Sequence, residues 1–198
     1  MGKETSGLQT QETNKVTYGL ENVHFSVITE RPDGTHEYGT PIPIRGAVEL
    51  GLEPQGEAIK LKADNIIYFA DESNEGYTGT LKVFLLPEEF MQQVLGETIE
   101  GGLVTEKAGI PKKSFALMFQ FEGDKNAVRH VLYNCNAKRP KVSSATKDGA
   151  NYNNDELSFE ASPRPKDKVI KRKTNKNTAK DIYDNWFKAV PDVTSVGG

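Results

Sequence analysis

Apolar and polar positions alternate with a period of two in several runs of this chain of 198 residues. The runs with this pattern are 47–53, 58–64, 115–121 and 156–162. In the first of them, Val48, Leu50 and Leu52 share one face. Because successive side chains of a strand point to opposite faces, the pattern is typical of strands with one face in a core. The chain is therefore predicted to be mainly β (α+β class), a β-sandwich or partial barrel with a flanking helix.

Further runs carry apolar residues on both faces, as expected of strands whose second face is also covered. These runs are 23–28, 80–86 and 129–136. Between residues 47–53 and 58–64 lie Pro54 and Gly56, which favour a turn. The two runs are therefore predicted to form a hairpin with each other.

One segment with helical spacing is residues 86–97. Pro87 suits a first helical position, and Gly96 is placed to end the helix. Its apolar stripe consists of Phe90, Met91, Val94 and Leu95. We expect this helix to pack its stripe against the sheet.

A second helix is predicted within residues 177–191. Thr178, followed three residues later by Asp181, resembles a capping box. The buried face would contain Ile182, Trp186 and Val190, with Phe187 beside them. Burying a large apolar side chain contributes about 1.5–3 kcal/mol, so this face would hold the helix on the sheet.

The chain divides into an N-terminal arm and one domain. Residues 1–14 are polar and predict a flexible arm, and residues 15–198 suit a single domain. Within it, residues 141–155 are rich in Ser, Asn, Asp and Gly, and are predicted to become ordered only on assembly, with Tyr152 as the anchor. Residues 163–190 would form a basic strand and a helix.

Composition argues against several kinds of chemistry. The formal net charge is −3, with both signs interspersed, and Cys135 is the only cysteine, which excludes an intrachain disulfide and a thiolate zinc site. His24, His36 and His130 are scattered, and no phosphate-binding glycine loop occurs. The sequence predicts no catalytic residues, no metal, no cofactor and no membrane partner, and therefore no enzyme.

The basic segment 163–180 allows two interpretations. It could contact nucleic acid, because neutralised phosphates release counterions. It could instead be a solvated edge strand whose lysines prevent pairing with other edges, and the lack of interleaved aromatic residues favours this second interpretation. Its basic residues surround a single Asp167 and are Arg164, Lys166, Lys168, Lys171, Arg172, Lys173, Lys176 and Lys180.

Longer phrases of the sequence resemble the major tail tube protein of long-tailed phages (siphoviruses) of Gram-positive bacteria. The resemblance runs in order from about Asn14 to about Val190. The phrases that carry it include "NKVTYGLENVHFSVITE", "YGTPIPIRGAVELGLEPQGE", "GYTGTLKVFLLPEEFMQQVLGE", "FALMFQFEGDKNAVRHVLYNCNAKRP" and "DIYDNWFKAV".

The resemblance implies a structural virion protein without catalytic residues. Subunits of that family form six-membered rings, and the rings stack into a hollow tube around the tape-measure protein, through which DNA later passes. The implied partners are further copies of the chain, the tape-measure protein, and the tail terminator and distal tail proteins. The implied location is the virion tail, assembled in the host cytoplasm. The alternatives are a nucleic-acid-binding module acting through residues 163–180 and a monomeric adhesive or enzymatic sandwich.

Given this resemblance, the stretch from Tyr38 to Asn65 has an expected role. Prolines fix φ and remove backbone donors, so an extended segment containing them loses little entropy when it docks on another subunit. The expected interface residues are Tyr38, Pro41, Ile42, Pro43, Ile44 and, from the later loop, Tyr152. The residues expected to face an acidic lumen are Glu49, Glu53 and Asp64.

Overall fold

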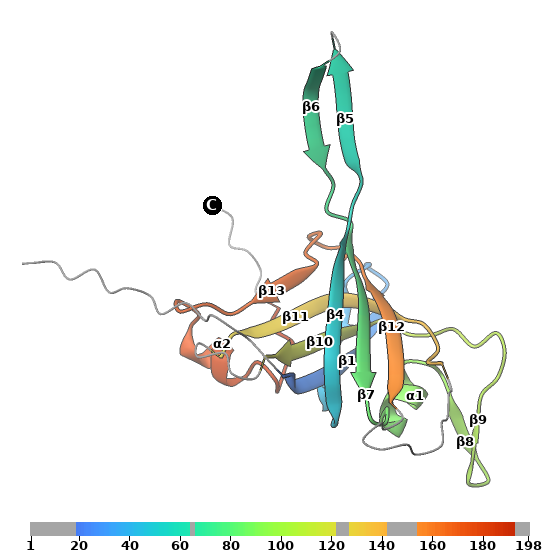
Figure 1. Ribbon diagram of the computed structural model, residues 1–198. Coiled ribbons are helices and arrows are strands. Elements are labelled where there is room, and N and C mark those ends of the chain that lie inside the picture. Colours follow the sequence, from blue (N-terminus) through green and yellow to red (C-terminus); the bar gives the residue numbers. More distant parts are fainter. Residues whose placement is uncertain (1–18, 64–65, 122–126, 142–153, 193–198) are drawn as a thin grey trace, which may run out of the picture.

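The computed structural model describes residues 19–63, 66–121, 127–141 and 154–192 (Figure 1). The described chain is mainly β, which confirms the predicted fold class. The strands are β1 Glu21–Glu30, β2 His36–Tyr38, β3 Ile42–Pro43, β4 Ala47–Gln55, β5 Ala58–Ala63, β6 Ile66–Glu72, β7 Gly76–Val83, β8 Thr98–Glu100, β9 Leu103–Thr105, β10 Phe115–Gln120, β11 Arg129–Ala137, β12 Asp155–Ala161 and β13 Lys171–Lys173. The helices are α1 Glu88–Gln93 and α2 Lys180–Asp184.

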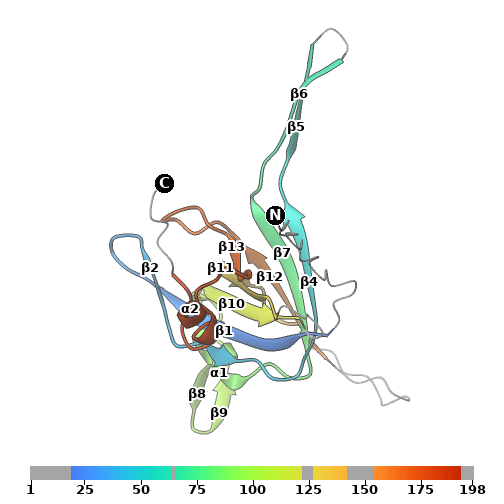
Figure 2. The ribbon, with the colours of Figure 1, turned by 90° about the vertical axis from the view of Figure 1, so that its left-hand side faces the viewer.

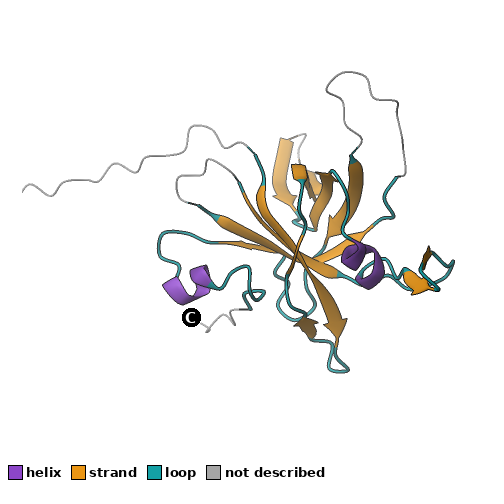
Figure 3. Cartoon of the chain, turned by 90° about the horizontal axis from the view of Figure 1, so that it is seen from below, coloured by secondary structure: helices purple, strands orange, loops and turns teal. Residues whose placement is uncertain are grey.

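Nine strands form one antiparallel sheet in the order β2-β1-β10-β11-β12-β7-β4, with β3 beside β1 and β13 beside β11. The long strand β11 pairs with β10 over most of its length but with β12 only through residues 135–137. The sheet therefore divides there into a half around β1 and β10 and a half made of β12, β7 and β4, as Figure 3 shows from below.

The main core contains residues from both halves of the sheet and from α1. Four buried phenylalanines link these elements through edge-to-face contacts. The ring centroids of Phe25 and Phe90 lie 5.0 Å apart, those of Phe90 and Phe115 lie 5.2 Å apart, and those of Phe115 and Phe159 lie 6.3 Å apart. Such pairs add about 0.5–1.5 kcal/mol beyond their buried area, so α1 is held to both halves of the sheet.

A second core lies on the other face of β10 and β11. Met118 and Val131 are fully buried there, covered by Trp186 and Val190 from the C-terminal segment. The run 115–121 is thus covered on both faces, not on the one face that its alternation alone predicts. The segment that starts at α2 is the cover, so this second core depends on it.

The predicted hairpin between residues 47–53 and 58–64 is wrong. Instead, β4 pairs with β7 and β5 pairs with β6, so β4 and β5 form one side of a long hairpin that projects from the body (Figures 1 and 2). The predicted turn residue Pro54 lies inside β4, an edge strand, where a missing N–H is tolerated.

Gly56 serves a close approach between strands and not a turn. A Cβ atom there would lie 1.7 Å from the carbonyl oxygen of Ser73. Backbone hydrogen bonds continue across this point, from Ser73 N–H to the Glu57 carbonyl at 3.1 Å and from Glu75 N–H to the Gln55 carbonyl at 2.9 Å. The β4–β7 and β5–β6 ladders are therefore joined without interruption. The proline and glycine of residues 54–56 had instead indicated a turn at this point.

Val48 was predicted to face the core but is 44% exposed. The register of β4 against β7 shifts between Ala47 and Glu49, so an extra residue interrupts the alternation at this point. Leu50 and Leu52, beyond the shift, pack against the core as predicted.

The first predicted helix is confirmed as α1. Phe90, Val94 and Leu95 are buried, Met91 is partly buried, and Gly96 follows with φ of +79°. It is shorter than predicted: Pro87 is the N-cap and not the first helical residue, and the helix ends at Gln93, so Val94 and Leu95 of the stripe follow it.

The second predicted helix is shorter than expected. α2 covers five residues, and its N-cap is Ala179 with no side-chain cap. The predicted capping box is wrong, because Thr178 Oγ1 accepts a hydrogen bond from the N–H of Asn175 instead. Trp186 and Val190 are nevertheless buried, because tight turns carry the apolar positions back onto the sheet.

The arm of residues 1–14, most of the loop 141–155 with Tyr152, and Asp64 lie outside the described residues. The predictions made for them stay predictions.

Substitution at Gly79 tests the packing of β7 against β12. A Cβ atom at Gly79 would lie 2.1 Å from Cζ of the fully buried Phe159 ring. We expect Gly79→Ala to lower the free energy of unfolding by about 1–3 kcal/mol, the usual cost of overpacking. Urea denaturation measures the loss.

The matched control is Gly51→Ala on the neighbouring strand, where a Cβ atom meets nothing within 4 Å. It should leave stability within about 0.5 kcal/mol of the parent. Equal losses in both variants would contradict the packing assigned to Phe159.

Candidate assembly surfaces

The outward face of β4, β7 and β12 presents polar side chains in cross-strand rows. Antiparallel registers set Glu49 opposite Lys82 and Lys82 opposite Glu156, and likewise set Glu53 opposite Thr78 and Thr78 opposite Glu160. Between these rows lies a third, made of Gly51, Thr80 and Ser158. We call this surface the acidic face; it consists of Glu49, Gly51, Glu53, Thr78, Thr80, Lys82, Glu156, Ser158 and Glu160.

Carboxylates outnumber the single ammonium group on the acidic face. Lys82 Nζ lies 2.7 Å from Glu49 Oε2, and this hydrogen bond and charge raise the pKa of Lys82. Glu160 pairs with Lys138, which follows β11, at 3.0 Å. Most of the face surrounds one shallow depression of about 350 Å³. A face of this kind attracts cations and repels polyanions.

The structure brings Glu49 and Glu53 together on this face, while Asp64 lies outside the described residues. Glu156 and Glu160 were missed as partners of these glutamates. Their alternation with Leu157 and Phe159 did predict that they point away from the core. Because the predicted hairpin paired the wrong strands, the sequence did not show that they share a face with Glu49 and Glu53.

The sheet ends at β4, a strand of nine residues that pairs only with β7 among the described elements. An edge strand leaves a row of backbone N–H and C=O groups that a strand from another chain can join. The acidic face therefore adjoins an open edge.

Residues 38–44 are anchored mainly within their own chain. Ile42 pairs with Phe25 in the β3–β1 ladder, Ile44 is buried in the main core, and Pro41 is also buried. Pro43 is exposed and free to contact a neighbour. Tyr38 is half-buried, its ring 6.0 Å from that of Tyr133, and burial raises its pKa to about 12. Their predicted role at a subunit interface stays a prediction.

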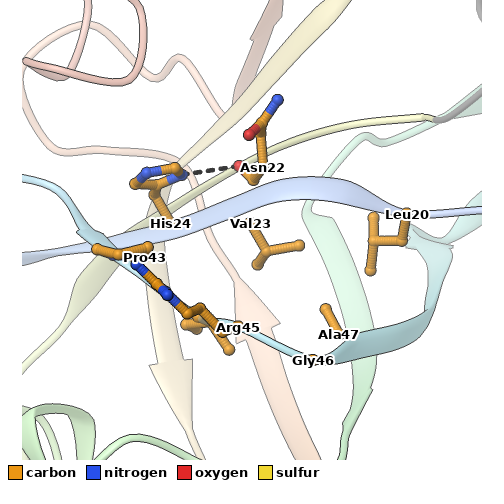
Figure 4. Close-up of a pocket in the computed structure, with 9 residues that line it drawn as sticks. Leu20, Asn22, Val23, His24, Pro43, Arg45, Gly46 and Ala47 are labelled. Atoms are coloured by element: carbon orange, nitrogen blue, oxygen red, sulfur yellow. Dashed lines mark hydrogen bonds between the residues drawn. The ribbon is translucent and has the colours of Figure 1, made fainter.

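A recess of about 490 Å³ lies between the start of β1 and residues 43–47 (Figure 4). The side chain of His24 is directed to the backbone, with its Nδ1 2.8 Å from the Asn22 carbonyl oxygen. The lining residues are Leu20, Asn22, Val23, His24, Pro43, Ile44, Arg45, Gly46 and Ala47. They include no carboxylate, hydroxyl or thiol, and His24 is the one lining residue whose side chain could act as an acid or base.

Arg164, the first basic residue of the basic segment, is buried and internally paired. Its Nε and Nη2 each donate a 2.6 Å hydrogen bond to Asp167, and its Nη1 donates to Asp192 at 2.9 Å. Its guanidinium also lies 4.3 Å from the ring centroid of Tyr133. This cluster joins the segment before β13 to the C-terminal segment and removes Arg164 from any external contact.

Within the described part of the chain, no three His, Cys, Asp or Glu side chains are grouped so as to hold a metal ion. Cys135 is buried in the main core, where desolvation raises the pKa of its thiol. Among the described helices, neither has the length and apolar character needed to cross a bilayer.

No family model and no curated protein matches the chain. Solved structures that match over most of the chain include chains of contractile injection systems. A chain of the PVC sheath/tube terminator shares 12% identity, covering 84% of this chain and 100% of that one, with a TM-score of 0.44. A chain of the anti-feeding prophage baseplate shares 7%, covering 83% and 97%, with a TM-score of 0.45.

A third similar structure is the tube-terminating cap of the anti-feeding prophage, with 14% identity, 85% and 99% coverage, and a TM-score of 0.42. TM-scores below 0.5 at such identities are too low to carry a functional conclusion.

Removing Arg164 tests the internal cluster. Arg164→Gln leaves Asp167 and Asp192 without their cation. We expect the free energy of unfolding to fall by about 3 kcal/mol. This is the lower end of the range for breaking a buried ion pair, because both carboxylates are partly exposed to water. Urea denaturation measures it. Lys176→Gln, at an exposed position, is the matched control and should stay within about 0.5 kcal/mol.

The same cluster predicts a pH dependence. Hydrogen bonds from Arg164 lower the pKa of Asp167 from 3.8 to about 2. A lowered carboxyl pKa adds stability above the unfolded value, and this stability is lost as pH falls through the folded value. Between about pH 4 and pH 2 the parent should lose more stability than Arg164→Gln; parallel pH profiles would contradict the assignment.

Proposed function

We propose that this chain is a structural subunit of a phage tail tube. Six copies form a ring, and the rings stack around the tape-measure protein into a hollow tube that later conducts DNA. The tube meets the tail terminator and distal tail proteins in the virion tail, after assembly in the host cytoplasm. The observation that carries this proposal is the acidic face, a charged, regularly spaced surface that adjoins the open edge of β4.

Lateral assembly would use the free edge of β4. A strand of the next subunit adds to the backbone groups of this edge, so the β12-β7-β4 half of each copy extends a sheet around the ring. Closed rings remove exposed edges, which otherwise promote uncontrolled aggregation. The exposed Pro43 and the half-buried Tyr38, together with the loop 141–155, are then available for contacts outside this ladder.

The acidic face would line the lumen. DNA carries one negative charge per phosphate, and binding is driven by release of its counterions to basic groups. A wall with Glu49, Glu53, Glu156 and Glu160 offers no free basic group to the phosphates, because its ammonium group, Lys82, is already paired with Glu49. DNA can therefore pass without being held.

The alternative of a nucleic-acid-binding module is less well supported. Arg164 is buried against two aspartates, and Arg172 lies 5.6 Å from the ring of Tyr133 and 3.9 Å from Asp167. Part of the positive charge of the segment is thus used inside the protein.

The test is electron microscopy of the purified chain over a range of concentrations, with its mass in solution measured by light scattering. We expect rings or hollow tubes with six-fold symmetry. A monomer at every concentration, also after addition of preformed tube ends as initiators, would contradict the proposal.

Reversing charge on the acidic face tests the lumen assignment. In assembled tubes of Glu49→Lys/Glu53→Lys, short DNA should be retained at low salt and released at high salt, because the new ammonium groups release counterions from phosphate. The control Glu30→Lys/Glu37→Lys has the same change in net charge, at exposed positions on β1 and β2. If the control retains DNA equally, the lumen does not lie at the acidic face.

A further inference from the structure

The exposed large apolar side chains gather at one end of the molecule. Among the described residues they are Leu85, Leu103, Val104, Phe84, Ile99 and Val48, with exposed fractions from 74% down to 44%. They belong to the start of β4, the residues directly after β7, and the β8–β9 hairpin. We call these six residues the apolar end. Large exposed patches of this kind mark interaction sites.

The strand registers and Figures 1 and 2 agree that these residues lie at one end of the molecule. Ala47 pairs with Val83, and Phe84 N–H donates to the Gly46 carbonyl at 3.0 Å, so Val48 and Phe84 lie at the same end of the β4–β7 ladder. Figures 1 and 2 both show α1 and the β8–β9 hairpin at this end, and the β5–β6 hairpin projecting from the opposite end.

The β8–β9 hairpin is a separate two-stranded sheet. Ile99 pairs with Val104, so these exposed aliphatic side chains lie side by side, and Leu103 projects beside Glu100 in the next pair, on the opposite face of the hairpin. A two-stranded hairpin without further packing is only marginally stable in water. Covering its aliphatic side chains with a partner would both stabilise it and remove apolar surface from water.

Charged side chains of opposite sign are exposed at the two ends of the molecule. At the apolar end, Glu88 and Glu89 in the first turn of α1 are exposed. At the opposite end, Ala161 pairs with Tyr77 next to the point where the long hairpin leaves the body, and the basic segment follows. Lys171 lies 4.5 Å above the ring of Tyr77 and so belongs to this end. The exposed lysines there are Lys166, Lys168, Lys171 and Lys173.

We propose that the apolar end of one copy docks on the basic end of a second copy, and that this contact, which rests on the proposed tail-tube function, joins successive rings. The aliphatic side chains of the β8–β9 hairpin supply the buried area, and the glutamates of α1 face the lysines of the basic segment. Repeated along one axis, a head-to-tail contact of this kind does not close on itself and gives open stacks. Apart from Val48, at the start of β4, its residues lie outside the strand that makes the lateral contact.

The chain is well suited to a labelling test, because its one cysteine, Cys135, is fully buried. A maleimide should therefore react selectively with Leu103→Cys. We expect rapid labelling at low protein concentration and protection in the assembled state. Asp181→Cys, at an exposed position on α2, is the control and should label equally in both states.

A second variant removes the contact without removing the hairpin. In Leu103→Ser/Val104→Thr, sedimentation velocity should show axial association weakened about tenfold, with rings retained, as expected for truncated aliphatic groups at an interface. The control Thr98→Ser on the same hairpin should associate as the parent does.

The outcomes separate the two proposals. Tubes that leave Leu103→Cys fully reactive would overturn this axial contact and leave the tail-tube function standing. Protection of Leu103→Cys in open chains without rings would support the contact and overturn the tube. Monomers at every concentration would overturn both.

Discussion

The pairing of β7 on both sides, with β12 and with the edge strand β4, is the constraint on which the remaining structure depends. This strand pairs with β12 along one side and with β4 along the other, so its register determines which outward side chains stand in rows. Its inward residues, Leu81 and Val83, are fully buried in the main core. Gly79 allows the Phe159 ring to lie against its backbone, which brings β12 into the same layer. One strand therefore connects the core with the surface proposed to line a lumen.

The long hairpin and the apolar end are two consequences of the same strand pair. At one end, β4 and β7 continue into β5 and β6, because Gly56 allows the two backbone segments to approach closely at Ser73. At the other end, the chain leaves β7 through Phe84 and Leu85 into α1 and the β8–β9 hairpin. A subunit with different surfaces at opposite ends is suited to head-to-tail stacking, and an open edge strand at its side is suited to lateral growth.

Charge has two different roles in this chain. On the acidic face, glutamates remain in water and shape the field outside the protein. In the Arg164 cluster, charges face one another inside the fold, where the geometry of a guanidinium between two carboxylates and over an aromatic ring compensates for lost hydration. The cluster holds the C-terminal segment in place, and Trp186 in that segment covers the second core.

The sequence by itself determined the local features: the mainly β class, the inward faces of residues 115–121 and 156–162, helix α1 with its apolar stripe, and the absence of catalytic spacing among the histidines. These follow from side-chain periodicity and short-range turn chemistry, which are properties of neighbouring residues. Only the tertiary structure decided which strands pair. Pro54 and Gly56 resemble a turn, yet β4 finds its partner in β7, more than twenty residues later, because that pairing buries Leu50 and Leu52 against a core built from distant strands. The acidic face and the contacts of Arg164 with Asp192 and Tyr133 are products of such long-range contacts, and for this reason no local pattern could reveal them.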